Sequence, residues 1–380
     1  MPFTLISQSA ISGGVGDSLR QNAKPIIING NMAVAQRGTS FADVSNGAYT
    51  LDRFRTSVSD DGAITITQEA LTSGNAYNDG FRTALKCDVT TADTSMTGTQ
   101  KFWIQQIIEA QDLQVLKYGT SSAEKITLAF WVKATKTGTN VVRLYAFDDD
   151  RSVSASYTIS QSDTWEHKVL NFPADTTGVI DNNNGQGIQI SWALAAGADF
   201  QSGTLATTWG TNTTANDFVG QVNHMDSTSN NFHITGVQLE VGEYTSSTLP
   251  DFQHEDFGDS LIRCQRYFQQ YGSNNSIYNM TPVDGHVMLI GIRDSGGSTN
   301  WMYPPVWQST PLRANPTISR SNLDFWSGGT AHSITGFGGN QYAGFNSIEA
   351  YVSGSTFADP IVAIKTNATS DTYIRFDAEL

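Results

Sequence analysis

The stretch KITLAFWVK, residues 125–133, alternates large apolar side chains with small or polar ones. A period of two predicts a β-strand with one buried face. The same alternation recurs along the chain at residues 63–68, 141–146, 166–172, 187–192 and 232–241. Turn-forming residues separate these segments, and no helical pattern lies between them. This succession of short strands predicts an all-β, antiparallel sandwich rather than strands that alternate with helices.

The sequence on either side of this series defines the other predicted domains. Residues 1–24 are small and polar, and they are predicted to form an N-terminal arm or docking segment. The first β-domain is predicted over residues 25–255, beginning with a strand at 26–28 that runs into a turn at 29–31. Residues 274–380 return to strand character and predict a smaller C-terminal β-sandwich, with strands near 287–292, 316–319, 347–352, 361–364 and 373–376.

One helical pattern separates the two β-domains. Within residues 256–273, apolar side chains recur with the spacing of one helix face, at Phe257, Leu261, Cys264, Phe268 and Tyr271. Burial of five such side chains contributes roughly 8–15 kcal/mol as an upper estimate. The sequence therefore predicts a connecting helix over 256–273 that packs on the β-body or on a neighbouring subunit.

The composition excludes several classes of partner. Charged residues make up 15% of the chain, the net charge is −14, and no basic run of the kind that binds phosphate is present. We therefore expect no nucleic-acid partner, and an anionic membrane surface is disfavoured for the same reason. No apolar run approaches the ~20 residues that span a bilayer, so no membrane insertion is expected. The N-terminus lacks a secretory pattern, so a protein acting outside the cell would be released by lysis.

The sequence contains no complete motif for catalysis or metal binding among those considered. His254 and Glu255 begin like a zinc-protease motif, but Gly258 stands where the second histidine is needed. The histidines show no ligand-type spacing, and the chain has neither a G-x-S-x-G motif nor a phosphate-binding loop. We therefore predict no catalytic residues, no metal and no cofactor, in a protein that is not an enzyme. A carboxylate pair from distant strands stays open as an alternative, because glycoside hydrolysis needs only two such groups.

Two further sets of residues carry structural expectations. Cys87 and Cys264 are too few for a disulfide framework and are predicted to be buried free thiols. The acidic run at residues 148–150 is predicted to be a solvated turn, with a calcium site as the sharper alternative.

The tryptophans provide the candidate ligand contacts. Four lie in strand-like contexts and are predicted to be core: Trp103, Trp131, Trp165 and Trp192. The others lie among glycine, serine, threonine and proline, where an exposed ring is plausible: Trp209, Trp301, Trp307 and Trp326. Because a ring offers a flat apolar face to a sugar, Trp301 and Trp326, on loops within 295–345, are the candidate ligand-binding residues. The alternative is that both simply pack the small C-terminal domain.

Several segments together resemble a widespread family of phage tail-fibre and appendage proteins. They occur in the family's order: 28–32 (INGNM), 36–41 (QRGTSF), 49–54 (YTLDRF), 128–134 (LAFWVKA), 232–242 (FHITGVQLEVG), 261–268 (LIRCQRYF) and 377–380 (DAEL). The resemblance implies a jelly roll similar to carbohydrate-binding modules, followed by a small β-domain, in a trimeric fibre, spike or decoration protein on a virion. It brings no catalytic residues. Because the strand ITGV at 234–237 has no aspartate, the structural calcium of such modules is not expected.

The shared segments also have a physical interpretation. Arg37, Arg53 and Arg55 lie close in sequence to Asp52, in a chain that is poor in positive charge. Buried arginine–carboxylate pairs are predicted to hold the start of the jelly roll.

The sequence thus predicts a phage virion structural protein, a tail fibre or other appendage, that attaches to host surface glycan. Its expected partners are other virion proteins through the N-terminal arm, two further copies in a homotrimer, and bacterial surface polysaccharide. One alternative is a head-decoration or tail-connector protein that recognises nothing. Another is a free carbohydrate-binding or depolymerising protein.

Overall fold

The computed structural model describes residues 24–59, 61–272, 278–279, 287–296, 299–303, 310–321, 323–327, 330–334, 336–337, 350–353, 361–366 and 373–380. In most strands after residue 270 it describes the backbone only. The chain forms two compact units. The first holds the described residues up to Ala33 together with Ser40–Tyr49 and Phe54–Asp256. The second holds Val34–Thr39, Thr50–Arg53 and Phe257–Leu380. The predicted arm lies almost wholly outside the described residues.

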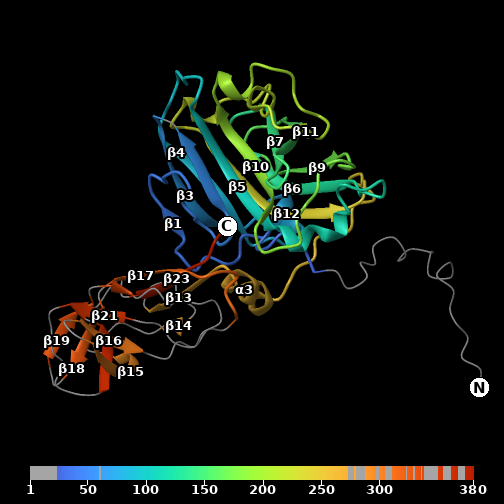
Figure 1. Cartoon of the computed structure of the whole chain (residues 1–380). Helices are drawn as coiled ribbons and strands as arrows, with labels where there is room; N and C mark the ends of the chain where they lie inside the picture. The colour runs from blue at the N-terminus through green and yellow to red at the C-terminus, as the bar shows by residue number, and fades with distance from the viewer. Residues whose placement is uncertain are drawn as a thin grey trace, which may run out of the picture. The chain divides into compact units, whose positions relative to one another are not determined.

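The first unit is a sandwich of two six-stranded antiparallel sheets (Figure 1). Sheet A has the spatial order β1 (Ser40–Phe41), β3 (Ala63–Ala70), β4 (Thr83–Thr91), β12 (Asn231–Val241), β6 (Ile126–Ala134) and β9 (Glu166–Phe172). Sheet B has the order β11 (Gly210–Thr211), β8 (Arg151–Ile159), β7 (Gly138–Ala146), β10 (Gln186–Ala196), β5 (Lys101–Glu109) and β2 (Arg55–Ser59). Short helical turns lie between strands: α2 (Asn75–Asn78), η1 (Ala110–Leu116), η2 (Ala198–Phe200), η3 (Thr214–Asn216) and η4 (His224–Asp226).

The core of the first unit lies between the two sheets. Phe130 of β6 is fully buried, and its ring lies 6.0 Å from that of Trp192 in β10 and 5.2 Å from that of Tyr157 in β8. Both contacts have the edge-to-face geometry that aromatic pairs prefer. These rings join sheet A to sheet B, and the predicted all-β jelly-roll sandwich is confirmed.

The predicted strands of the first domain form, with one exception. Residues 26–28 do not pair as a strand. The side chain of Gln106 on β5 satisfies both backbone groups of Ile28, accepting from its N–H at 3.2 Å and donating to its carbonyl at 3.0 Å. A side-chain amide thus takes the place of a neighbouring strand here.

Two of the tryptophan predictions are wrong. Trp131 is half-buried rather than core, because its neighbours Phe130 and Val132 take the inward positions of β6 and are 0% exposed. Trp209 is buried rather than exposed, and its indole N–H donates to the carbonyl of Pro173 at 2.9 Å. The predicted burial of the remaining described rings, Trp103, Trp165 and Trp192, is confirmed. Trp307 lies outside the described residues.

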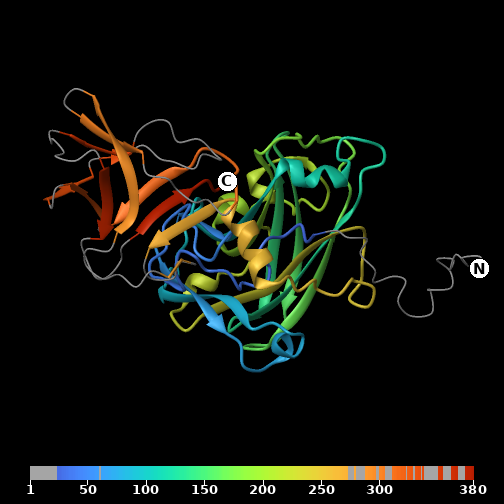
Figure 2. The ribbon, with the colours of Figure 1, turned by 90° about the horizontal axis from the view of Figure 1, so that it is seen from below.

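The second unit begins with α3 (Phe257–Gln265), the coil drawn in gold in Figure 2, and continues in strands. Its four-stranded sheet has the order β14 (Tyr278–Asn279), β13 (Phe268–Gly272), β23 (Tyr373–Asp377) and β17 (Thr317–Ser321). Its seven-stranded sheet has the order β19 (Thr330–Ser333), β18 (Leu323–Ser327), β22 (Ile361–Thr366), β15 (Val287–Gly296), β16 (Thr299–Tyr303), β21 (Ala350–Ser353) and β20 (Gly336–Phe337).

The helix is shorter than the predicted 256–273. Residues 268–272 pair with β23 as strand β13 instead of continuing α3. Cys264 and Phe268 are buried as predicted, whereas Phe257 is 57% exposed. Both cysteines are buried free thiols, as predicted. No helix of the described residues is long and apolar enough to cross a membrane.

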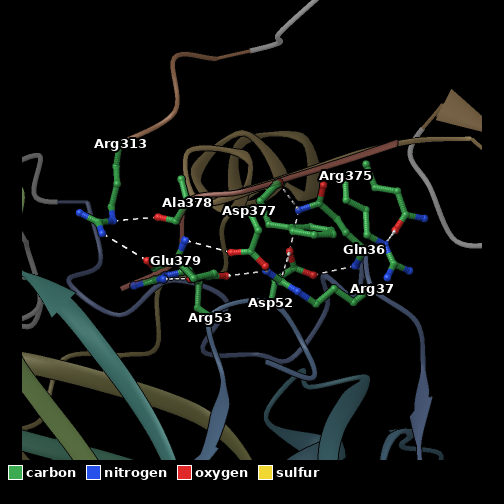
Figure 3. A network of polar contacts seen from close by, with 11 residues as sticks. Gln36, Arg37, Asp52, Arg53, Arg313, Arg375, Asp377, Ala378 and Glu379 are labelled. Atoms are coloured by element: carbon green, nitrogen blue, oxygen red, sulfur yellow. Dashed lines mark hydrogen bonds and ion pairs between the residues drawn. The ribbon is translucent and has the colours of Figure 1, made fainter. Parts of the chain in front are cut away.

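Two segments predicted to belong to the first domain are part of the second unit, and a buried polar network explains why (Figure 3). Arg37 Nη2 lies 3.1 Å from Asp377 Oδ2 and 3.3 Å from Glu379 Oε1, and Arg53 also pairs with Glu379. Asp52 accepts hydrogen bonds from the backbone and the side-chain amide of Gln36, each at 2.6 Å. The carboxylates that hold the arginines thus come largely from the end of the chain.

Aromatic rings complete this network. The guanidinium of Arg37 lies 3.6 Å from the ring centre of Phe268, and that of Arg53 lies 3.4 Å from the ring centre of Tyr267. Such contacts favour arginine over lysine. The predicted buried arginine–carboxylate pairs are therefore present, but they hold the second unit rather than the start of the jelly roll. Arg55 lies in β2 of the first unit, where its guanidinium lies 5.7 Å from the ring centre of Tyr49.

Candidate functional site

A pocket of about 360 Å³ opens on the outer face of sheet A. This volume lies in the range of about 300–1,000 Å³ that is usual for small-molecule sites. Its lining comes from β6, β9 and β12, from the turn after α2, and from the segment after β12. All of these belong to the first unit.

One wall consists of Trp131 and His167. The two residues are directly opposite each other on β6 and β9, so their side chains project from the same face of the sheet. Their rings stack with centroids 5.0 Å apart and an interplanar angle of 27°. The alternation that buries Phe130 and Val132 places this pair on the outside.

A second wall is an aromatic cluster of Phe81, Phe252 and His254. Their ring centroids lie 4.9 to 5.1 Å apart. Phe81 follows the turn after α2 and is buried, whereas His254 is exposed. The wall therefore joins a turn between β3 and β4 to the segment that follows β12.

A bulge in β12 shapes the floor between the walls. The register of β12 against β6 shifts between Thr235 and Gln238, and Gly236 has a φ of 61°. A Cβ atom at Gly236 would lie 2.6 Å from the ring of Phe81, so a side chain cannot be accommodated there without moving that ring. Bulges of this kind redirect the side chains that follow them.

The deepest polar group of the pocket is the amide of Gln238, which is 5% exposed. Its Nε2 donates to the carbonyl of Pro250 at 3.2 Å. Its Oε1 is buried and has no hydrogen-bond partner among the described residues. An unsatisfied buried acceptor costs free energy, and a ligand that donates a hydrogen bond would remove that cost.

The remaining polar groups of the pocket lie at its exposed rim. Asp79 and Asp251 contribute carboxylates, and Ser246 contributes a hydroxyl group. Burial lowers the pKa of His167, although Asp79 opposes this shift, so the imidazole is neutral at neutral pH. No lysine or arginine is among the lining residues within the described part of the chain. The pocket therefore combines aromatic walls with hydrogen-bond acceptors.

The outer face of sheet B also carries polar and aromatic side chains, but they are engaged with one another. Arg143 Nη1 lies 2.5 Å from Asp217 Oδ2, and its Nη2 donates to Gln189 at 3.2 Å. Trp103 packs against Phe218, with ring centroids 4.6 Å apart. Asp217 and Phe218 belong to the segment between β10 and β12, which covers this face.

The predicted ligand residues Trp301 and Trp326 lie in strands of the second unit, so their predicted placement on loops is wrong. Trp301 is in β16, paired with Asp294 and Tyr351, and Trp326 is in β18, paired with Ala331 and Ala363. Their side chains lie outside the described residues, so their role stays a prediction. The pocket on sheet A was not predicted. The alternation in KITLAFWVK could have indicated it, because Trp131 falls on the same strand face as Thr127 and Lys133, opposite the apolar face.

The acidic run at 148–150 lies in an exposed turn, as predicted, and two of its carboxylates bind the backbone of a distant segment. Asp148 accepts a hydrogen bond from the backbone of Asp181 at 2.9 Å, and Asp149 accepts one from the backbone of Val179 at 2.5 Å. Within the described residues, no group of three or more histidine, cysteine, aspartate or glutamate side chains is placed to hold a metal ion.

No family model matches the sequence, and no curated protein matches it. Solved structures with a similar fold include the enzymatically active domain of tailspike protein 4 from bacteriophage CBA120, at 14% identity and a TM-score of 0.27. That match covers 53% of this chain and 21% of the tailspike chain. A putative sugar-binding protein from Bacteroides thetaiotaomicron matches at 15% identity and a TM-score of 0.30, over 57% of this chain and 100% of its own. A CBM4 module matches at 13% identity and a TM-score of 0.27, over 57% and 99%.

Proposed function

We propose that this chain is a structural protein of a phage virion, a tail fibre or another appendage, that attaches the particle to bacterial surface glycan through the pocket on sheet A. The observation that carries the proposal is the pocket itself, with two aromatic walls and a buried acceptor on the outside of a β-sandwich. A sugar offers flat C–H faces to the rings and hydroxyl groups to the acceptors, so the pocket and the ligand are complementary.

The virion assignment has separate support. The ordered segments described above resemble phage appendage proteins. The chain is also poor in charge, at 15%, as expected of an all-β particle protein with a neutral, hydrogen-bonding surface. In this proposal the protein is made in the host cytoplasm, docks on other virion proteins through residues 1–24, and is not an enzyme.

The proposed homotrimer would convert weak contacts into avidity. The two large apolar side chains exposed on α3, Phe257 and Ile262, offer surface for burial against another copy. Light scattering of the purified protein should give three times the chain mass of 41.2 kDa. A clean monomer mass at about ten micromolar would contradict the trimer.

Adsorption to host cells tests the proposed glycan contact. Trp131→Ala removes one wall of the pocket, and we expect binding to fall about tenfold or more, which corresponds to ~1.4 kcal/mol. Tyr145→Ala is the matched control, since Tyr145 is a half-buried aromatic residue on the outer face of sheet B. The control should bind cells as the parent does.

Other outcomes would favour the alternative functions. If the folded parent binds neither cells nor polysaccharide, a head-decoration or tail-connector protein is the better interpretation. If the parent shortens a polysaccharide that it binds, the chain is a depolymerising protein. Equal binding by the parent and Trp131→Ala would remove the pocket on sheet A from the proposal.

A further inference from the structure

We propose that the pocket on sheet A selects a neutral, hydroxyl-rich sugar residue and rejects sugars that carry a carboxylate, phosphate or sulfate group. This inference rests on the proposed function and defines the chemical class of the ligand at the same site. Its basis is the kind, depth and charge of the polar groups that line the pocket.

The buried polar group of the pocket accepts a hydrogen bond. Nε2 of Gln238 donates to the carbonyl of Pro250, whereas Oε1 is buried beside the pocket and has no hydrogen-bond partner among the described residues. A sugar hydroxyl can donate to this oxygen, whereas an ionised carboxylate, phosphate or sulfate has no proton to donate. An acidic group at this depth would leave two acceptors facing each other without water, which is costly.

The charges around the pocket oppose an anion as well. Asp79 and Asp251 lie at the rim, and like charges brought together across a binding interface reduce affinity. The lysine on the same face of β6, Lys133, lies 5.4 Å from the ring centre of Trp165 and interacts electrostatically with Glu69. This lysine is therefore already engaged at a neighbouring part of the face.

The depth of the groups also favours a neutral sugar over a cationic amino sugar. A buried ammonium group needs a carboxylate at its own depth to offset desolvation. Here both carboxylates are exposed at the rim, and the buried acceptor is the neutral amide of Gln238. A hydroxyl group satisfies that amide without bringing a charge into the pocket.

An array of defined bacterial oligosaccharides tests the inference with the full-length protein. Neutral members should be arrayed beside counterparts of the same linkage that carry a uronic acid, a phosphate or a free amino group. We expect the neutral members to bind at least about tenfold tighter than their acidic counterparts, a difference that corresponds to ~1.4 kcal/mol. Asp79→Asn should narrow this gap by improving the binding of the acidic members.

The double variant Asp79→Asn/Asp251→Asn should narrow the gap further, once its melting shows that it folds. Equal or tighter binding of acidic members by the parent would overturn the inference but leave glycan binding intact. Tightest binding of members with a free amino group would overturn it in favour of a cationic ligand. If the parent binds no oligosaccharide on the array, the proposed function itself fails.

Discussion

The two sheets of the first unit carry similar polar and aromatic side chains on their outer faces, but one face is covered by a connecting segment and the other carries a pocket. On sheet B, Arg143 pairs with Asp217 and donates a hydrogen bond to Gln189, and Trp103 is buried under Phe218. On sheet A, Trp131 and the amide of Gln238 face a pocket, and one amide oxygen has no partner among the described residues. Arg143 Nε, Asp217 Oδ1 and Trp103 Nε1 on sheet B are also buried without a hydrogen-bond partner among the described residues. An unsatisfied polar group on a sheet face therefore indicates a binding site only where it lies beside a pocket, as on sheet A.

The connecting segments create this difference. The segment between β10 and β12 brings Asp217 onto Arg143 and two phenylalanines, Phe200 and Phe218, onto Trp103. The segment after β12 instead passes beside its sheet, so that Pro250 and Phe252 form a rim. Loops, rather than strands, decide which face is closed.

The largest expected effect on stability tests the ion pair between Arg143 and Asp217 on the covered outer face of sheet B. Asp217→Ala removes the carboxylate from a buried pair and leaves Arg143 charged, so we expect a loss of about 3–5 kcal/mol in the free energy of unfolding. The matched control is Asp79→Ala, an exposed rim carboxylate, which should change stability by less than about 0.5 kcal/mol. Urea unfolding of both variants makes the measurement. Equal stability of the two variants would mean that the faces do not differ as described.

Acid should destabilise the first unit through His224, whose ring packs against the buried Phe232 of β12. Burial lowers the pKa of this histidine to about 4, and its Nε2 lies 2.7 Å from the side-chain oxygen of Asn140. In the unfolded chain His224 is protonated as the pH falls below about 6.5, whereas in the folded chain it is protonated only near pH 4. The free energy of unfolding should therefore fall by about 3 kcal/mol as the pH drops through this window.

The matched variant for this titration is His224→Gln, which keeps a hydrogen-bonding side chain but has no such proton equilibrium. Urea unfolding between pH 7 and pH 4 should give a flatter dependence for the variant than for the parent. Parallel curves would show that His224 does not contribute.

Adjacent residues of β6 allow the inner and outer faces of sheet A to be compared directly. Phe130→Ala should cost about 3–5 kcal/mol, as is usual for a fully buried ring. Trp131→Ala should cost roughly half as much, because the ring is only half-buried, and the variant should stay soluble. Thermal melting of the two variants compares the inner and outer positions directly. An equal loss at both positions would place Trp131 in the core after all.

Much of the fold was predictable because it depends on local patterns. The alternation of apolar side chains located several strands of each unit, and the stripe of residues 257–271 located α3, whereas β4, β5 and β8 of the first unit and β16 and β18 of the second were not predicted. Local patterns do not show where a helix stops when the next residues can pair with a distant strand. Residues 268–272 pair with 373–377, about a hundred residues later, and this pairing ends the helical region early.

The candidate site was less predictable for the same reason. The pocket brings together Asp79, Trp131 and Asp251, which are widely separated along the chain. The second unit likewise includes Arg37 and Arg53 because both pair with Glu379, which lies more than three hundred residues later in the chain. Sequence spacing revealed that these residue types were unusual, but it did not reveal their partners. The strand that carries Trp131 was predicted correctly, but the burial of Trp131 was not. Its position in the alternation of β6 places the ring on the outer face, although a large apolar side chain is usually buried.

The smallest expected effect concerns Trp301 and Trp326, the ligand contacts predicted from the sequence. They lie in strands β16 and β18 of the second unit, and glycine residues are close to both in the sequence. A ring beside small residues allows close approach of a sugar, but each such contact is weak, so we expect Trp301→Ala and Trp326→Ala to reduce cell adsorption by only a few-fold. Trp131→Ala should reduce cell adsorption more, since it removes one of the two rings that form a wall of the pocket on sheet A. Each variant must first melt like the parent, because loss of a packed ring would also lower adsorption. If both folded variants adsorb as the parent does, the second unit contributes no glycan contact at these residues and recognition depends on the open face of sheet A.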